Sequence, residues 1–361
     1  MKPRKVTMAD VAREAGVSPA TVARVLYANG FVVAEKRTIV EGALRKTGYR
    51  PNVMARGLRT SRSFTMGMVV SECRLNAFHP YVAHEVQIEA LKHGYSVLTL
   101  NNNHSDAVED AGVQRFLDQH VDAVIFCGAV SPNNVRLTAG AGIPTVQVER
   151  EVCRIGNKVL VDPQPGMNEA VAHLRELGHE RIAYIGGMLN ERRVEKQIKI
   201  SVEEYRERAF GIAMTGAGLS VSPELVRLGP YYVENSNRQT GHVLMRRLLA
   251  LENPPTAVIT GSDLLAAGAL QAIREENLTV PGDISVIGYD DTMAEVLTPP
   301  LTSIAQPIAE LGRMAVTLAL HAIGRAKAKP RVETFQTRLV LRESTAQPRV
   351  LSIRKRQLLQ S

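Results

Sequence analysis

The strongest constraint on the fold is an alternation of short apolar segments with helical segments between residues 64 and 290. Apolar segments of four to seven residues are typical of strands that are buried on both faces of a parallel sheet. The segments between them cover such a sheet as helices. Strands are predicted at 66–70, 95–100, 122–127, 144–148, 158–161, 181–186, 256–260 and 284–290, and helices at 81–93, 106–119, 166–177, 203–217 and 263–276.

This number of strands predicts an α/β body made of two lobes, each with a doubly wound parallel sheet. A chain of 361 residues is long enough for two or three domains. Ligands of such sheets bind at the carboxyl ends of the strands, so the two lobes would surround one cleft. We assign the body to residues 64–348, with a first lobe at about 64–162 and 292–323 and a second lobe at about 163–291 and 324–348.

Residues 1–49 have a different pattern, which predicts an all-α headpiece. Thr7 can cap a first helix with Asp10 as the reciprocal carboxylate, and Gly16 can end it. Ser18 can cap a second helix that has Pro19 at its first position. Two helices this short and this close predict a helix-turn-helix, although an ordinary pair of core helices is the alternative. The side chains expected to face inward are Met8, Val11, Ala12, Ala15, Val22, Val25 and Leu26, with Ile39, Val40, Ala43 and Leu44 on a third helix at 34–47.

The positive charge of the chain is concentrated in its first segment. The whole chain has a net charge of +8, whereas residues 1–62 hold 13 Lys and Arg against 4 Asp and Glu, which is +9. The remainder holds 31 basic and 32 acidic residues, which is −1. A solvated basic face is one explanation for a charge cluster, but this segregation favours a polyanionic partner for the first segment alone.

Residues 50–63 predict a hinge between the headpiece and the body. Asn52 could cap one or two helical turns at 53–59, a length that is unstable alone in water. We therefore expect this segment to become ordered with DNA and a second copy of the chain, and a plain linker is the alternative. Residues 349–361 form a basic tail with too few heptads for a four-helix assembly, so a dimer is favoured over a tetramer.

From Val6 to about Pro348 the chain resembles the lactose and galactose repressor (LacI/GalR) family of bacterial transcription factors. The resemblance implies a helix-turn-helix headpiece and a body similar to periplasmic sugar-binding proteins, which binds a small effector between its lobes. The segments that carry it are VTMADVAREAGVSPATVARVL at the start, GYRPNVMARGLR at the hinge, ELGHERIAYIGG (176–187), PPTAVITGSDLLAAGALQAI (254–273) and VPGDISVIGYDDTMAEVLTPPLTSIAQP (280–307).

The resemblance also implies which residues contact DNA. The second helix would enter the major groove, where Arg24 can bond bidentately to guanine, while Pro19 and Ala20, with Ala23 beside them, offer apolar contact only. In the hinge, Leu58 would be the apolar wedge that opens a central base step. The remaining DNA contacts expected are Thr7, Ser18, Thr21 and Asn29 to phosphates, Met8 next to Thr7, Asn52 as a cap, and Ala55 facing the minor groove.

An effector site is implied at two further positions. Arg206 matches the family's effector-binding arginine, and Asp290 matches the carboxylate that grips hydroxyl groups. An Arg and an Asp that face each other across a cleft suit a sugar or a sugar acid, and a structural salt bridge is the alternative. The segment 190–200 is the least similar to the family, and its basic residues could reach an anionic effector or form a solvated face.

Three further positions complete the predicted effector site. Asn76 and Phe78 resemble the family's first-strand loop Asn-Pro-Phe-Phe, but Ala77 and His79 depart from it. Ser262 stands where the family commonly has asparagine. These departures leave the exact wall of the pocket open.

Other classes of protein fit the sequence less well. A nucleotide-dependent enzyme of Rossmann type would carry GxGxxG after its first strand, where this chain has SECRLN, and no Ser/His/Asp or metal-ligand spacing recurs. The cysteines Cys73, Cys127 and Cys153 are scattered, which argues against disulfide and zinc frameworks. Without a signal peptide or an apolar span, the cytoplasm is expected.

We therefore predict a repressor without catalytic residues, metal or cofactor. It would act as a homodimer on a near-palindromic operator, under control of the effector. Whether the effector is an inducer or a co-repressor stays open.

Overall fold

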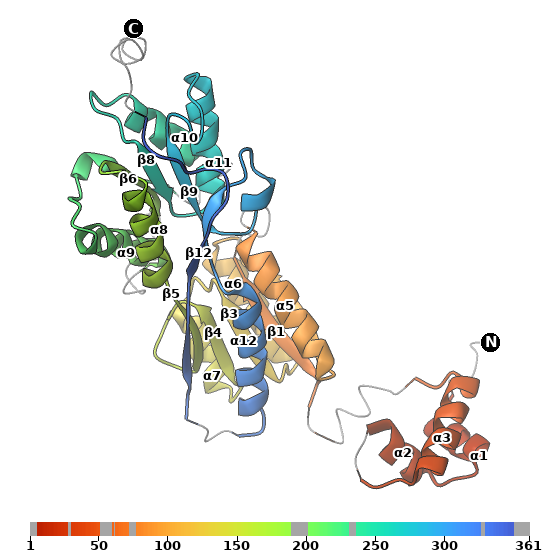
Figure 1. The fold of residues 1–361 in the computed structure, drawn as a ribbon. Helices are drawn as coiled ribbons and strands as arrows, with labels where there is room; N and C mark the ends of the chain where they lie inside the picture. Colours follow the sequence, from red (N-terminus) through yellow and green to blue (C-terminus); the bar gives the residue numbers. More distant parts are fainter. Residues whose placement is uncertain are drawn as a thin grey trace. The chain divides into compact units, whose positions relative to one another are not determined.

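The structure is a computed structural model that divides into two compact units, Met1–Ser63 and Phe64–Ser361. We describe each unit by itself (Figure 1). No helix in the described part is long and apolar enough to cross a membrane. The structure describes residues 6–27, 30–50, 60, 62–71, 77–188, 201–230, 236–325 and 329–349.

The first unit is the predicted helix-turn-helix followed by a third helix. A capping box begins the first helix, because Asp10 N donates to Thr7 Oγ1 at 3.4 Å and Thr7 N donates to Asp10 Oδ2 at 2.9 Å. Gly16 ends it in the left-handed conformation with φ +63°, which costs glycine little. The helices are α1 (Met8–Ala15), α2 (Pro19–Tyr27) and α3 (Ala34–Thr47).

The three helices enclose a small apolar core. Val11, Val22 and Val40 are fully buried, one on each helix. The prediction for Ile39 was wrong, since its side chain is 45% exposed. Val40 and Ala43 are three positions apart and turn α3 so that Ile39 points away from the core.

The first lobe of the larger unit contains a six-stranded sheet in the order β11-β5-β4-β3-β1-β2. All its strand pairs are parallel, as the short apolar segments predict. Helices α5 and α12 pack together on one face (Figure 1), and α6 and α7 pack against each other on the other. The strands are β1 (Thr65–Val70), β2 (Ser96–Asn101), β3 (Ala123–Cys127), β4 (Thr145–Glu149), β5 (Asn157–Asp162) and β11 (Val332–Gln336), and the helices are α5 (Phe78–Lys92), α6 (Asp106–Asp118), α7 (Pro132–Gly140) and α12 (Ile308–Ala322).

The second lobe repeats this plan with the order β12-β10-β9-β8-β6-β7, in which only β12 is antiparallel to its neighbour. Helices α8 and α9 form one pair and α10 and α11 the other. The two doubly wound lobes confirm the predicted fold. The elements are β6 (Ile182–Met188), β7 (Val226–Pro230), β8 (Ala257–Thr260), β9 (Ser285–Asp290), β10 (Thr302–Ala305), β12 (Arg338–Val340), α8 (Gln164–Glu176), α9 (Val202–Gly216), α10 (Ser236–Leu249), α11 (Asp263–Glu275) and the 3₁₀ turns Pro223–Leu225 and Ala294–Val296.

The lobe predicted from the sequence was wrong for two strands. Strand β10 falls in the segment 292–323 expected in the first lobe, but it pairs with β9 in the second. Strand β11 falls in the segment 324–348 expected in the second lobe, but it pairs with β5 in the first. A buried strand shows in local sequence, whereas its hydrogen-bond partner lies far along the chain. The described chain therefore passes between the lobes after β5, after β10 and after β11.

Candidate functional site

A cavity of about 270 Å³ lies between the two lobes at the carboxyl ends of the strands, where the fold predicts a ligand. This volume is close to the lower end of the range of small-molecule sites. The first lobe contributes the ends of β4 and β5, and the second contributes α9 and β9. The lining residues are Glu149, Arg150, Glu151, Leu160, Val161, Asp162, Pro163, Val202, Tyr205, Arg206, Tyr289, Gln306 and Thr334.

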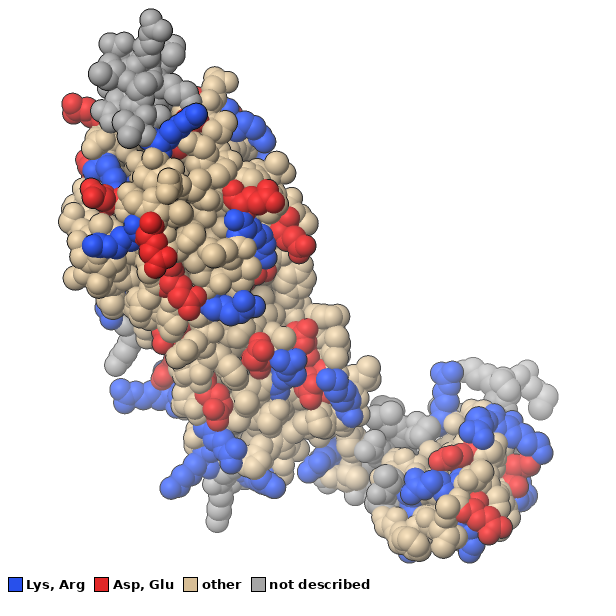
Figure 2. All heavy atoms as spheres, viewed as in Figure 1, with Lys and Arg blue, Asp and Glu red and all other residues tan. Residues whose placement is uncertain are grey.

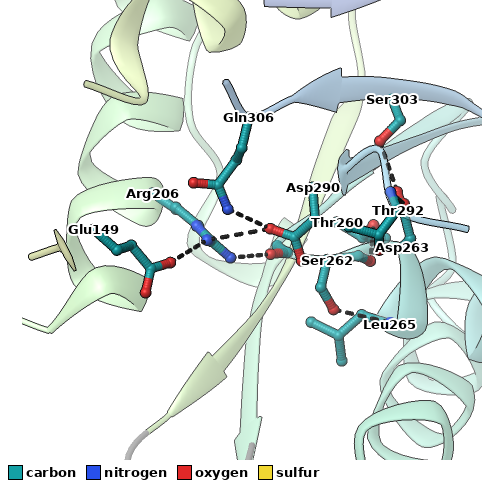
Figure 3. Close-up of polar contacts among 11 residues, drawn as sticks. Glu149, Arg206, Thr260, Ser262, Asp263, Leu265, Asp290, Thr292, Ser303 and Gln306 are labelled. Carbon is teal, nitrogen blue, oxygen red and sulfur yellow. Dashed lines mark hydrogen bonds and ion pairs between the residues drawn. The ribbon is translucent and has the colours of Figure 1, made fainter. Parts of the chain in front are cut away.

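Arg206 lies at the centre of this cleft and contacts both lobes (Figure 3). Its side chain is 6% exposed, and Nη1 donates to the Gly261 carbonyl at 2.7 Å. Nη2 lies 3.3 Å from Glu149 Oε1 in the first lobe and 3.3 Å from Asp290 Oδ1 in the second. The guanidinium also sits 4.1 Å from the centre of the Tyr289 ring, a cation–π contact. The predicted Arg206–Asp290 pair is therefore present, and Glu149 extends it across the cleft.

A capping box sets the position of Arg206 on α9. Ser201 Oγ accepts a hydrogen bond from Glu204 N at 3.1 Å, and Ser201 N donates to Glu204 Oε2 at 2.6 Å. These bonds satisfy two amides at the first turn, so α9 begins at a defined residue next to the cleft. Arg206 then follows on the second turn and points inward, while Arg208 is exposed.

The two carboxylates that contact Arg206 have unusual backbone conformations. Glu149 has φ +76° at the end of β4, and Asp290 has φ +95° at the end of β9. Such left-handed conformations cost a non-glycine residue on the order of 1–3 kcal/mol and persist where surrounding contacts impose them, often at binding sites. Here they turn both carboxylates toward one guanidinium.

Two buried carboxyl groups, Glu149 and Asp290, face Arg206 in the cleft. Burial raises the pKa of Asp290 from 3.8 to about 7, and the Arg206 charge offsets only part of this effect. Burial likewise raises the pKa of Glu149. Gln306 Nε2 donates to Asp290 Oδ1 at 2.7 Å, which holds this carboxyl in place. One guanidinium thus faces two carboxyl groups that are both costly to ionise.

The raised pKa of Asp290 predicts a pH-dependent stability that Asp290→Asn removes. Below pH 3.8 the carboxyl is protonated in the folded and the unfolded chain; up to about 7 only the folded chain keeps the proton. The folded state then binds more protons, so stability falls as pH rises through this window and levels off above it. The stability lost across this pH window is at most about 4 kcal/mol.

This prediction can be measured by urea unfolding followed by circular dichroism, since the chain has no tryptophan. The wild-type minus Asp290→Asn stability should be lower at about pH 8 than at about pH 5. Asp263 also has a pKa raised to about 6 by burial, but it is present in both proteins and cancels in the difference. An unchanged difference between the two pH values contradicts the prediction.

One predicted effector residue, Ser262, has a structural contact in place of a cleft contact. Ser262 is 1% exposed and caps α11, because Leu265 N donates to its Oγ at 3.2 Å. Its neighbour Asp263 accepts from Ser303 Oγ at 2.6 Å and from Thr292 N at 2.8 Å, which ties β10 and the loop after β9 to α11 (Figure 3). Ser262 therefore fixes the start of α11, and Asp263 fixes the loop that follows Asp290.

The first-strand loop contributes differently from the prediction. Phe78 is 1% exposed and packs in the apolar core of the first lobe, with the His79 ring at 5.4 Å. Burial lowers the pKa of His79 to about 3, so this side chain is neutral. Asn76 lies outside the described residues, as does the segment 190–200. Neither Phe78 nor His79 lines the cleft.

Sequence reasoning missed the contribution of the first lobe. Glu149 and Arg150 follow the apolar run 144–148 directly, and charged residues after a buried strand are a signal for a site at the carboxyl edge. Arg150 lines the cleft, and its Nη2 donates to the Ala129 carbonyl at 2.9 Å. Gln306 lies in the family-like segment 280–307 but was not predicted as a site residue.

The headpiece presents the predicted reading face of α2. Pro19, Ala20 and Arg24 are exposed, and Ala23 is half-buried beside them. Arg24 is the one charged residue of α2, so it is the strongest hydrogen-bond donor on this face. Met8 and Thr21 are half-buried, Thr7 is exposed, and Asn29, Asn52, Ala55, Leu58 and the tail after 349 lie outside the described residues.

Ser18 and Thr21 form a small hydroxyl pair at the start of α2. Thr21 N donates to Ser18 Oγ at 3.2 Å, and the two hydroxyl oxygens are 3.0 Å apart. Ser18 is therefore the cap that the sequence predicts, and it is exposed. Hydroxyl groups at the N-terminus of a helix suit a phosphate oxygen.

Both parts of the chain match known protein families. Residues 7–52 match the model of bacterial regulatory proteins of the lacI family, and residues 171–345 match the periplasmic binding protein-like domain. The chain is 30% identical over 342 residues to the HTH-type transcriptional repressor CytR of Escherichia coli (strain K12), covering 94% of this chain and 96% of CytR. It is 32% identical over 321 residues to the ribose operon repressor of the same strain, covering 88% of this chain and 93% of that repressor.

A solved structure is similar over nearly the whole length. The Lac repressor dimer bound to operator and the anti-inducer ONPF has a TM-score of 0.74 and 26% identity, covering 95% of this chain and 100% of that one. Headpiece, two-lobed body and their order along the chain all correspond. The chain therefore belongs to the LacI family of bacterial regulatory proteins, which are DNA-binding transcriptional regulators.

Proposed function

We propose that the protein is a transcriptional repressor that binds a near-palindromic operator through its headpiece. Its affinity for this operator falls or rises when a small effector occupies the cleft. The observation that carries this proposal is Arg206, whose guanidinium contacts Glu149 in one lobe and Asp290 in the other. A ligand that takes over any of these contacts changes the interaction between the lobes. This gives the effector different affinities for two lobe arrangements, which is the requirement for allosteric control.

The charges of the cleft favour a neutral sugar over a sugar acid as the effector. Arg206 already faces two carboxyl groups, so an anion must displace one of them. A neutral polyol can instead donate hydroxyl protons to Glu149 or Asp290 and accept from Arg206, which leaves the charge balance unchanged. The relatives above support a small-molecule ligand, since the Lac repressor structure holds the anti-inducer ONPF.

A homodimer is part of the proposal. Helix α5 exposes three large apolar side chains on one side, with Tyr81 47%, Ile88 41% and Leu91 73% exposed. Exposed apolar side chains grouped in this way favour burial against a partner. A second copy would also pair two headpieces, which a near-palindromic operator requires.

We also propose that the protein is cytoplasmic and is not an enzyme. The relatives named above are repressors, which supports a regulator that acts where DNA is accessible. It needs no metal or cofactor for the contacts described.

Calorimetric titration of the full chain tests the effector class. Neutral sugars, sugar acids and sugar phosphates are titrated in turn, and each ligand that binds is then added to the protein on duplex DNA. We expect a neutral sugar to bind and to change DNA affinity. Tighter binding by the anionic classes overturns the neutral-sugar proposal, and an effector that leaves DNA affinity unchanged overturns the allosteric one.

A further inference from the structure

The body has an edge at which the chain arrives from the headpiece. Phe64 directly precedes β1, and Phe64 N donates to Asp122 Oδ2 at 3.0 Å just before β3 begins. Because every strand pair of the first sheet is parallel, the amino-terminal ends of all six strands lie along this same edge. The C-terminal end of α12 lies there too, because the chain continues from it into β11.

A cluster of basic side chains occupies this edge at the junction of α12 and β11. We call His321, Arg325, Lys329 and Arg331 the basic edge; all four residues are exposed. Arg325 Nη1 lies 3.1 Å from His321 Nδ1, and Arg331 N donates to Asn157 Oδ1 at 2.9 Å, which fixes the start of β11. Figure 2 shows Lys and Arg side chains gathered at this lower end of the larger unit, with acidic side chains further up.

The positive charge of the basic edge is not balanced by nearby carboxylates. Among the described residues, no ion pair joins Arg325 or Arg331 to an acid, whereas other surface cations such as Lys92 and Arg313 are paired with Glu89 and Glu310. The charges of Arg331 and Arg325 also lower the pKa of His321. A lowered pKa at an exposed histidine indicates a positive local potential, because nearby positive charges disfavour protonation.

Stabilisation of the helix end explains part of this cluster and not all of it. His321 is the basic residue in the last turn of α12, where a cation favours the helix by roughly 0.3–1 kcal/mol, whereas Arg325 lies beyond the helix end. Arg331 precedes a strand, so the helix dipole gives no reason for its charge. Its exposed guanidinium adds repulsion to the cluster unless an anion binds there.

We propose that the basic edge binds phosphates of the DNA that flanks the site read by the headpiece. The proposal rests on the proposed repressor function and adds a DNA contact made by the body. The 14 residues 50–63 can extend over at most about 50 Å, so DNA held by the headpiece stays within reach. Strand β1 is four strand spacings from β11, which is roughly 19 Å. One DNA strand has about one phosphate per 3.4 Å, so it carries five or six phosphates over this length.

The test measures the salt dependence of binding to a long random-sequence duplex by fluorescence anisotropy, so no operator is needed. Three full-length proteins are compared: wild type, Arg325→Ala/Arg331→Ala, and Arg246→Ala/Arg247→Ala on α10 of the second lobe as a control with the same net charge. The slope of log affinity against log salt is negative, and each lost phosphate contact makes it less steep by about 0.9. We expect this change in the first double variant only.

The outcomes separate the inference from the function it rests on. An Arg325→Lys/Arg331→Lys variant should keep the wild-type slope, because lysine retains the charge. Equal slopes for wild type and Arg325→Ala/Arg331→Ala, or equal losses in both alanine variants, overturn the inference while the repressor function stands. If the wild type binds no duplex with salt-dependent affinity, the proposed function itself fails.

Discussion

Arg206→Ala is expected to abolish the response to effector while leaving operator binding intact. The substitution removes a guanidinium that contacts both lobes and leaves Glu149 and Asp290 without it. A hydrogen bond to a charged group contributes about 1.5–3 kcal/mol, so effector affinity should fall by roughly 10- to 150-fold. Calorimetry measures the effector affinity, and anisotropy on DNA with and without effector measures the response.

The buried carboxyls make this experiment feasible. Since burial already raises the pKa values of Glu149 and Asp290, both groups can take up a proton when the guanidinium is removed, which limits the loss of stability. Arg208→Ala is the matched control, because Arg208 is on the same helix and exposed. Circular dichroism checks folding, and Arg206→Lys replaces the alanine variant if that one unfolds. A folded Arg206 variant with wild-type effector affinity rules out the proposed site.

Arg24→Ala is expected to remove much of the discrimination between operator and random DNA while effector affinity stays unchanged. Pro19 and Ala20 offer no side-chain hydrogen bonds, so Arg24 must supply the directional contact of this face. A bidentate contact to guanine is worth about 1–3 kcal/mol, so the ratio of operator to random affinity should fall by about 5- to 150-fold. The operator is first obtained by selection from a random library, and both affinities are then measured at one salt concentration.

Arg45→Ala serves as the control for charge, since Arg45 is exposed on α3 outside the predicted reading face. It should weaken operator and random binding by similar factors or by none. If Arg24→Ala and Arg45→Ala change the ratio equally, α2 is not the reading helix. If Arg24→Ala also lowers effector affinity, the division into a reading unit and a sensing unit is wrong.

The headpiece could be predicted almost completely from the sequence because its determinants are local. Thr7 and Asp10 are three residues apart, and Gly16 and Ser18 mark the turn, so capping chemistry alone predicts both helix ends. The single error, at Ile39, concerns which of two adjacent apolar residues faces the core. The rotation of α3 about its axis depends on packing against α1 and α2, which are distant in sequence.

The effector site could be predicted only in part. Arg206 and Asp290 were identified by resemblance, and they do lie within 3.3 Å of each other. Glu149, the first-lobe partner, was missed because a single acid at a strand end does not reveal which lobe it faces. Ser262 and Phe78 were assigned to the effector, but a cap hydrogen bond and core packing occupy these side chains, and such contacts are invisible before the chain is folded.

The sequence by itself determined the all-α headpiece, the segregated charge and the doubly wound character of the body, since helix caps, apolar runs and residue counts are properties of neighbouring residues. Only the tertiary structure decided that β10 and β11 exchange lobes, that Glu149 joins Arg206 and that Arg325 and Arg331 meet at the edge where the chain enters the body. Each of these depends on pairing between strands or charges from distant parts of the chain, and such pairing is selected by the packing of the whole body.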